Sequence, residues 1–235
     1  MILIAIPARL QSTRLEKKLL SPIGDYPLLW WTWQKAKQSK LAQKIIIATD
    51  SQEIFDVMTS FGADCVMTPA DCSSGSDRIF QATKDLQEAK VIVNLQGDEP
   101  LMKVEILEGT IQTLLNNPDC DIATAVAPFN NLEDWQNPNN VKAVFNEHKR
   151  ALYFSRAPLA NGHLHIGLYV FRKESLGKFC SFPNSSLEKA ERLEQLRALE
   201  NNLKIYVYKS NELGEDHFGI DTPDDLERAK KILLK

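Results

Sequence analysis

Several features that would define a class of protein are missing from this 235-residue sequence. No apolar run is long enough to span a bilayer, and the apolar N-terminal stretch has neither a basic n-region nor a small-residue cleavage site. The four cysteines include no Cys-x-x-Cys pair, so neither a zinc site nor a disulfide framework is indicated. A net charge of −3 gives no reason to expect a nucleic-acid partner. These absences predict a cytoplasmic protein with reduced thiols and no membrane partner.

The loop after the first predicted strand also lacks the common glycine-rich phosphate fingerprints, because it contains neither Gly-x-Gly-x-x-Gly nor Gly-Lys-Ser/Thr. No internal repeat or low-complexity linker interrupts the chain. The hydrophobic share of 43% and the charged share of 25% are ordinary for a globular protein, and 235 residues can bury a full α/β core. We therefore expect a single domain over residues 1–235.

Apolar strands alternate with amphipathic helices through the first half of the chain, which predicts a parallel sheet covered on both faces. Strands are predicted near residues 2–7, 44–48, 64–67 and 91–95, and helices over 28–39, 52–61, 77–88 and 104–116. Ser51 is a predicted N-cap, with Glu53 in the first turn of its helix. The first half is therefore expected to be a Rossmann-like α/β layer.

The second half of the chain is richer in strands. Candidates lie at residues 122–128, 141–146, 151–155 and 166–171. Because few helices separate them, part of this region is expected to be antiparallel, and the sheet as a whole is expected to be mixed. Residues 125–172 are interpreted as an appendage within the single domain. Helices return over residues 186–201 and 222–234, and they flank a strand at 204–208.

The segment after the first strand concentrates positive charge. Arg9-Leu-Gln-Ser-Thr-Arg-Leu-Glu-Lys-Lys18 carries four cations in ten residues, with hydroxyl groups between them. Arg9 and Arg14 could each place a guanidinium fork on phosphate oxygens, while Lys18 offers a compact ammonium. We interpret the segment as a polyphosphate cradle. A solvated basic loop is the alternative.

A carboxylate follows the strand predicted at residues 91–95. In open α/β sheets ligands bind at the carboxyl ends of the strands, and an oxygen ligand at Asp98 suits a Mg²⁺ ion that carries a phosphate chain. Asp98 alone could equally be a turn or N-cap residue. Near the C-terminus, Thr222 and Pro223 fit a helix start, so the preceding Asp221 is not needed for capping. We therefore expect Asp221 to share a metal with Asp98 if the two segments converge.

Other segments carry weaker signals. Ser73-Ser-Gly-Ser-Asp-Arg78 places a glycine among hydroxyls just before a helix, which suits either close approach to a phosphorylated ligand or an ordinary N-cap. Arg156 follows a predicted strand, where an arginine readily clamps a carboxylate.

Two pairs of polar residues are predicted to share a face. His165 and Tyr169 point to the same side of one strand. Glu191 and Gln195 are four residues apart on the helix predicted over 186–201. A satisfied half-buried pair and a solvated helix face are the respective alternatives.

Taken together, six motifs in chain order resemble the 3-deoxy-manno-octulosonate (Kdo) cytidylyltransferases, also called CMP-Kdo synthetases. They are Ile6-Pro-Ala-Arg-Leu-Gln-Ser-Thr-Arg-Leu15, Asn94-Leu-Gln-Gly-Asp-Glu-Pro100, Ala151-Leu-Tyr-Phe-Ser-Arg156, His165-Ile-Gly-Leu-Tyr169, Leu193-Glu-Gln-Leu-Arg197 and Gly219-Ile-Asp-Thr-Pro-Asp-Asp-Leu-Glu-Arg228. The resemblance implies an α/β nucleotide-diphospho-sugar transferase fold and Mg²⁺-dependent transfer of CMP from CTP to Kdo for lipopolysaccharide assembly. It also implies a homodimer formed largely through the appendage.

The resemblance further implies roles for individual residues. Arg9, Lys18 and Asp98 would be catalytic. The nucleotide would be bound by Arg9, Arg14, Lys18, Ser74 and Arg78, and magnesium by Asp98 and Asp221. The sugar acid would be surrounded by Gln96, Arg156, His165, Tyr169, Glu191 and Gln195. The anomeric hydroxyl would attack the α-phosphorus of CTP and expel pyrophosphate, so no protein nucleophile is required.

Two departures from the family pattern bear on the substrate. Family members usually read Arg-Leu-Pro-Gly-Lys-Pro-Leu in the first loop, whereas this chain reads Arg14-Leu-Glu-Lys-Lys-Leu-Leu20. Between Arg156 and His165, a short segment replaces a markedly longer one. The nearest rival substrates are therefore 8-amino-Kdo and other sugar acids such as sialic or legionaminic acid. A degenerate nucleotide-binding protein without turnover is the rival from another class.

Overall fold

The computed structural model describes residues 1–10, 15–211 and 218–235. The chain forms two compact units, and we describe each by itself. Unit 1 comprises Met1–Leu107 with Gly214–Lys235, and unit 2 comprises Glu108–Leu213. Helix α4 (Val104–Asn116) begins in unit 1 and ends in unit 2. No helix in the described part of the chain is long and apolar enough to cross a membrane.

The sheet of unit 1 is parallel. Its strands are β1 (Ile2–Ala8), β4 (Lys44–Thr49), β5 (Cys65–Met67) and β6 (Val91–Leu95), and their spatial order is β6-β1-β4-β5. Parallel strands that are covered on both faces read as continuous apolar runs, and Leu3 to Ile6 are accordingly fully buried. The predicted parallel sheet is confirmed.

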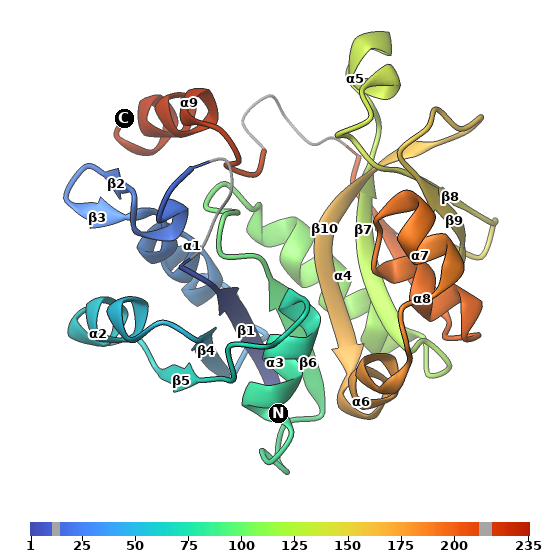
Figure 1. The fold of residues 1–235 in the computed structure, drawn as a ribbon. Helices are drawn as coiled ribbons and strands as arrows, with labels where there is room; N and C mark the ends of the chain where they lie inside the picture. The colour runs from blue at the N-terminus through green and yellow to red at the C-terminus, as the bar shows by residue number, and fades with distance from the viewer. Residues whose placement is uncertain (11–14, 212–217) are drawn as a thin grey trace. The chain divides into compact units, whose positions relative to one another are not determined.

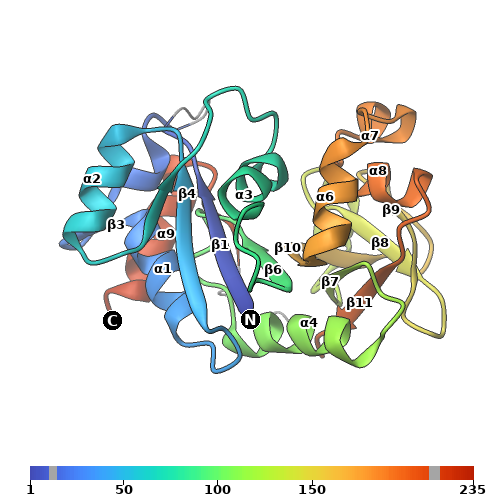
Figure 2. The ribbon, with the colours of Figure 1, turned by 90° about the horizontal axis from the view of Figure 1, so that it is seen from below.

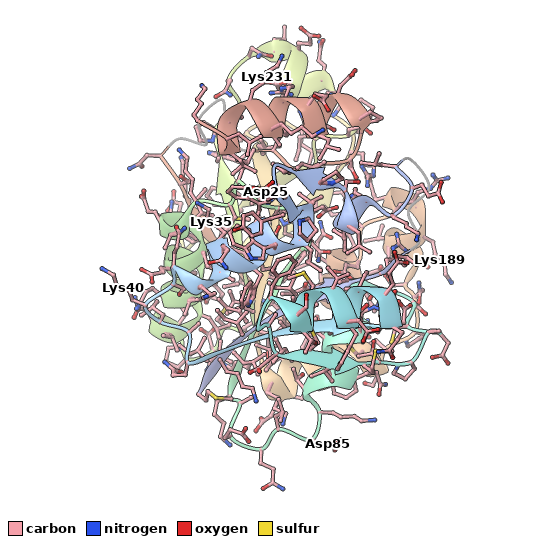
Figure 3. All side chains as sticks on the ribbon, turned by 90° about the vertical axis from the view of Figure 1, so that its left-hand side faces the viewer. Asp25, Lys35, Lys40, Asp85, Lys189 and Lys231 are labelled. Atoms are coloured by element: carbon pink, nitrogen blue, oxygen red, sulfur yellow. The ribbon has the colours of Figure 1, made fainter. Side chains whose placement is uncertain are left out.

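Helices lie on both faces of this sheet. They are α1 (Leu28–Lys37), α2 (Gln52–Ser60), α3 (Gly75–Thr83) and α9 (Pro223–Leu233), with a 3-10 turn η1 (Lys18–Leu20) and a short hairpin of β2 (Pro22–Ile23) and β3 (Tyr26–Pro27). Figure 2 shows α3 on the opposite face from α1 and α2. Lys35 on α1 and Lys231 on α9 point outward, as expected for the polar faces of covering helices (Figure 3).

Side-chain caps fix where several of these helices begin. The Ser51 side chain accepts a hydrogen bond from the Ile54 amide at the start of α2, as predicted. Thr222 and Asp225 form a reciprocal capping box at the start of α9, with a proline in the first turn. The helix predicted over residues 77–88 instead begins at Gly75, because the Ser74 side chain caps the Asp77 amide.

Unit 2 contains a mixed sheet (Figure 1). Its strands are β7 (Ile122–Ala127), β8 (Lys142–Phe145), β9 (Ala151–Ser155), β10 (His163–Arg172) and β11 (Ile205–Lys209). β7 pairs in parallel with β11 and in antiparallel fashion with β10, while β8 pairs in antiparallel fashion with both β9 and β10. The predicted antiparallel pairing in this region is confirmed.

Four helices belong wholly to unit 2: α5 (Leu132–Gln136), α6 (Lys173–Ser181), α7 (Ser186–Glu191) and α8 (Gln195–Glu200). The predicted appendage, residues 125–172, lies within unit 2. The unit itself covers a longer range, Glu108–Leu213. A role of that segment in dimerisation stays a prediction.

The single helix predicted over residues 186–201 was wrong, because the chain forms α7 and α8 with a break between them. Arg192 ends α7 in the left-handed conformation, with φ 56° and ψ 48°. The Arg197 guanidinium donates hydrogen bonds of 2.6 and 2.9 Å to the Glu188 carboxylate, and both side chains are buried. This bidentate pair ties the two short helices together.

Candidate functional site

The loop after β6 brings the C-terminal segment to the carboxyl edge of the unit 1 sheet. Asp98 follows the strand across Gly97, where a Cβ atom would lie 3.1 Å from the Pro7 carbonyl oxygen and 3.2 Å from the Leu19 side chain. The Ile220 amide donates a 3.0 Å hydrogen bond to the Asp98 carbonyl oxygen. Gly97 therefore permits close packing against Pro7 and Leu19, while the hydrogen bond from Ile220 holds the segment that contains Asp221 beside Asp98.

Lys18 bridges the two carboxylates that were expected to share a metal if their segments converged. Its Nζ atom lies 2.5 Å from Asp98 Oδ2 and 3.0 Å from Asp221 Oδ1, and its side chain is only 12% exposed. Burial alone lowers the pKa of Lys18, but the charges of both carboxylates outweigh burial and raise it above its usual value of 10.5. The lysine is therefore a fixed cation between two anions.

Negative charge is concentrated around this lysine. Burial, together with the charges of Asp98 and Asp221, raises the pKa of Glu99 to about 8. Burial is the larger cause of this shift, and the charges of Asp98 and Asp221 add a negative contribution to the local potential. Such a potential attracts cations, so the electrostatics of this edge suit a metal ion.

The donor set fits a magnesium ion that is completed by its ligand. No group of three or more possible ligands is found in the residues that the structure describes. Mg²⁺ is commonly held by one or two carboxylates, with phosphate oxygens and water filling the remaining positions. Asp98 and Asp221 supply two oxygen donors that already converge on one cation. These residues would hold the metal, an assignment that remains a prediction.

Unit 1 also contains a pocket of about 200 Å³. Its lining includes Arg9, Ser74, Arg78 and Gln96, together with Pro7 and Gly75. The structure thus brings four sequence-predicted residues together. Arg14 lies outside the described residues.

Two of the lining residues are already engaged with the protein. Ser74 caps α3, and its Oγ atom also donates a 3.0 Å hydrogen bond to Asp77 Oδ2. Arg78 is 4% exposed and donates hydrogen bonds of 2.8 Å to Asp50 Oδ2 and 2.7 Å to Thr68 Oγ1. Arg78 therefore shapes the pocket wall from a fixed position, whereas Arg9 is exposed at its rim.

Gln96 is oriented by a buried residue that we did not predict to be functional. Asn94 is fully buried in β6, accepts a 3.0 Å hydrogen bond from Gln96 Nε2 and donates one of 3.2 Å to Ser76 Oγ. The sequence signal for this role was that Asn94 places an amide side chain among the apolar residues of Val91–Leu95. A buried polar side chain is costly without partners, so this network fixes the Gln96 amide in the pocket wall.

In unit 2, Glu191 organises the end of β9. Its two carboxylate oxygens accept hydrogen bonds of 2.6 Å from Ser155 Oγ and 2.9 Å from the Arg156 amide. The Arg156 guanidinium donates to the backbone oxygens of Glu191, at 3.0 Å, and Pro138, at 3.2 Å. The structure therefore joins Glu191 and Arg156, and the guanidinium bonds only carbonyl oxygens among the described residues.

His165 is hydrogen-bonded to Thr124. Its Nε2 atom lies 2.8 Å from Thr124 Oγ1, and the Thr124 hydroxyl donates its one proton to the Leu168 carbonyl oxygen, also at 2.8 Å. With the hydroxyl proton directed at that carbonyl oxygen, the ring proton would lie on His165 Nε2 and Nδ1 would be an acceptor. Burial lowers the pKa of His165 to about 3, so the ring is neutral at physiological pH.

Tyr169 and Gln195 meet beside this histidine. The rings of His165 and Tyr169 are 5.6 Å apart, and Tyr169 OH donates a 3.0 Å hydrogen bond to Gln195 Oε1. Gln195 is 4% exposed, and its Nε2 atom is buried with no hydrogen-bond partner among the described residues. A buried amide donor without a partner is costly, and it points to a ligand oxygen as the missing acceptor.

The predicted pairing of Glu191 and Gln195 on one helix face was wrong. The left-handed Arg192 separates them, so Glu191 ends α7 and Gln195 begins α8. Glu191 consequently bonds to β9, while Gln195 bonds to Tyr169 on β10. The same break creates the buried Glu188–Arg197 ion pair, which spacing alone does not indicate.

Comparison with known proteins places these features in a family. The family model described as cytidylyltransferase matches residues 3–205. The 3-deoxy-manno-octulosonate cytidylyltransferase of Chloroherpeton thalassium is 42% identical over 243 residues, which covers 99% of this chain and 97% of that protein. The enzyme of the same name from Leptospira biflexa is 39% identical and covers 96% of this chain and 94% of its own length.

A solved structure agrees with these sequence matches. The chain resembles CMP:2-keto-3-deoxy-manno-octonic acid synthetase complexed with CTP, with a TM-score of 0.93 and 32% identity over 99% of this chain and 98% of that one. The predicted nucleotide-diphospho-sugar transferase fold is therefore confirmed. The chain belongs to the cytidylyltransferase family and, within it, to the 3-deoxy-manno-octulosonate cytidylyltransferases.

Proposed function

We propose that unit 1 binds CTP and unit 2 binds Kdo, and that the protein joins them as CMP-Kdo for lipopolysaccharide assembly. The single observation that carries this proposal is the Lys18 ammonium between the Asp98 and Asp221 carboxylates at the carboxyl edge of a parallel sheet. That edge is where open α/β sheets bind ligands, and a mixed-charge cluster there suits a polyphosphate with its counter-ion.

The nucleotide half rests on the pocket of unit 1. Arg9 at its rim presents a guanidinium suited to phosphate oxygens, and Lys18 presents an ammonium one loop away. Gln96, which the family resemblance assigned to the sugar acid, lines the same pocket with an oriented amide. Because Lys18 already pairs with two carboxylates, its ammonium would contact the phosphate and these carboxylates at the same time.

The acceptor half rests on the polar groups of unit 2. The Arg156 guanidinium suits the carboxylate of a sugar acid. His165 Nδ1 can accept a hydrogen bond from a sugar hydroxyl, and the unpartnered Gln195 Nε2 can donate one. A ligand with one carboxylate and several hydroxyl groups would satisfy all three.

The reaction needs no covalent intermediate with the protein. The anomeric oxygen forms a bond to the α-phosphorus of CTP, the bond between the α- and β-phosphates breaks, pyrophosphate leaves, and the hydroxyl proton is released. Lys18 and Arg9 would stabilise charge on the phosphate oxygens, and Arg156 would orient the acceptor. When bound at Asp98 and Asp221, Mg²⁺ would supply Lewis-acid stabilisation of the phosphate oxygens.

The direct test measures pyrophosphate release with Mg²⁺ and each of CTP, ATP, GTP and UTP. Each nucleotide is paired in turn with Kdo, 8-amino-Kdo and a sialic acid. Release only with CTP and Kdo supports the proposal in full. Release with CTP and a different sugar acid would keep the reaction and replace the substrate.

Binding of CTP without release from any sugar would support the degenerate binder instead. That alternative is disfavoured because Lys18, Asp98 and Asp221 are all present and converge. A homodimer and a cytoplasmic location accompany the proposal as predictions.

A further inference from the structure

Lys17, the residue before the bridging lysine, has an unusual backbone conformation. Its φ is 48° and its ψ is 35°, which lies in the left-handed region that glycine adopts freely and that side-chain-bearing residues avoid. A lysine there stays in place only if other interactions compensate for the unfavourable conformation. The 3-10 turn η1 (Lys18–Leu20) begins immediately after it.

An ion pair outside the turn holds Lys17. Its Nζ atom lies 2.9 Å from Oε1 and 2.8 Å from Oε2 of Glu53, in the first turn of α2. Both side chains are about half exposed, at 49% for Lys17 and 44% for Glu53, so the pair is accessible and screened by salt. The contact nevertheless joins the loop to a helix whose N-cap is itself fixed by Ser51.

The conformation of Lys17 determines where Lys18 points. The Lys17 carbonyl oxygen accepts a 2.8 Å hydrogen bond from the Leu20 amide, and Lys18 donates its own amide to the Leu15 carbonyl oxygen at 3.1 Å. Leu19 is buried beneath the turn. If Lys17 relaxed to a negative φ, the chain direction would change one residue before Lys18. Its ammonium would then leave the position between the two carboxylates.

We propose that Lys17 is a positioning residue: its ion pair with Glu53 stabilises the left-handed turn that delivers Lys18 to Asp98 and Asp221. The inference rests on the proposed function only in taking Lys18 as a contact of the CTP phosphates. It assigns Lys17 no direct contact with the nucleotide. Glycine at position 17 should therefore make the ion pair unnecessary, because glycine needs no compensation for a left-handed backbone.

Three single variants separate the effect of the Lys17 backbone conformation from the effect of its charge. Lys17→Ala loses the ion pair and keeps the unfavourable conformation, so its KM for CTP should rise about five-fold, or about 1 kcal/mol. Lys17→Gly should stay within about two-fold of the unmodified protein, although it lacks the same charge. Glu53→Ala should resemble Lys17→Ala. The KM for Kdo should not change in any of them.

A double variant tests whether Glu53 acts through Lys17. Glu53→Ala should raise the KM for CTP in the original background but not in Lys17→Gly, where the ion pair is already absent. Lys149→Ala is the matched control: Lys149 also has a left-handed φ of 62°, and its ammonium lies over the Phe145 ring in unit 2. This control should leave the KM for CTP unchanged.

Each result has a defined meaning. An equal rise in Lys17→Gly and Lys17→Ala would overturn the proposal, since the charge and not the backbone would then matter. An unchanged Lys17→Ala would overturn it as well. Absence of turnover in the unmodified protein would instead overturn the proposed function, so the two failures are distinguishable. Thermal unfolding of each variant confirms that the fold is intact.

Discussion

Replacement of Asp98 by asparagine should separate catalysis from folding. The side chains have the same shape, and the change removes one charge from the cluster at the edge of the unit 1 sheet. Lys18 keeps its 3.0 Å contact with Asp221. The change also removes one of the negative charges that raise the pKa of Glu99. These two effects oppose the loss of the Lys18–Asp98 ion pair.

The expected loss of stability is therefore small. The ion pair joins side chains that are 12% and 29% exposed, and solvent screening limits its contribution. We expect a loss of about 1 kcal/mol or less, which lowers the melting temperature of a chain of this size by about 2–4 °C. Most of the molecule should not respond, because Asp98 contributes no apolar core.

The expected loss of activity is much larger. A carboxylate that holds a metal against a reacting phosphate group stabilises charge only as the reaction proceeds, and such preorganised groups are worth about 3–4 kcal/mol. That value corresponds to a fall of about 10²–10³ in turnover. Asp119→Asn is the matched control, because Asp119 also pairs with a lysine, Lys204, at 2.9 Å on the surface of unit 2.

The assay combines pyrophosphate release, with Mg²⁺ varied, and thermal unfolding. An Asp98→Asn protein that turns over normally with an unaltered Mg²⁺ dependence would refute the metal assignment. A protein that loses activity only because it has unfolded would refute the separation of catalysis from folding. Asp119→Asn should retain both activity and fold.

Three further predictions concern other charged groups. Lys18→Ala should raise the KM for CTP more than the KM for Kdo, which steady-state kinetics with each substrate varied will show; equal changes would contradict a phosphate contact. Arg197→Met should leave the buried Glu188 carboxylate without its ion-pair partner and destabilise the protein by about 3–5 kcal/mol. Thermal unfolding should show this as a lower melting temperature, and an unchanged melting temperature would show that the ion pair is dispensable. Burial lowers the pKa of His165 to about 3, below about 6.5 in the unfolded chain, so the stability it contributes is complete above pH 6.5 and is lost as the pH falls towards 3. Because residue His165 as a whole is not fully buried, we discount the effect and expect a loss of about 1 kcal/mol between pH 7 and pH 5. This loss should be absent in His165→Phe, and an identical pH dependence in both proteins would contradict the prediction.

Local signals predicted much of the fold. The apolar run Val91–Leu95 is a strand with the predicted bounds. Ser51 and Thr222 cap helices as expected, since a cap requires only contacts within a few residues. Interactions of this range can be read from sequence because both partners lie close together along the chain.

Contacts between residues far apart in the sequence could be predicted only where charged residues indicated them. The edge rule for parallel sheets placed Asp98 at a ligand-binding edge, and metal sharing with Asp221 was expected only if the two segments converged. The position of Lys18 between them was not predicted, because Lys18 lies 203 residues from Asp221. The break at Arg192 was missed because a left-handed arginine has no sequence signature and helical spacing continued through it. The left-handed Lys17 escaped prediction for the same reason.

The central claim is that CMP passes directly from CTP to Kdo. The measurement that tests it most directly is the ratio of pyrophosphate released to CMP-Kdo formed, with each reactant omitted in turn. The account predicts one pyrophosphate for each CMP-Kdo, and none when CTP, Kdo or Mg²⁺ is absent. Pyrophosphate release without a sugar acid, or CTP binding with no release under any condition, would contradict it.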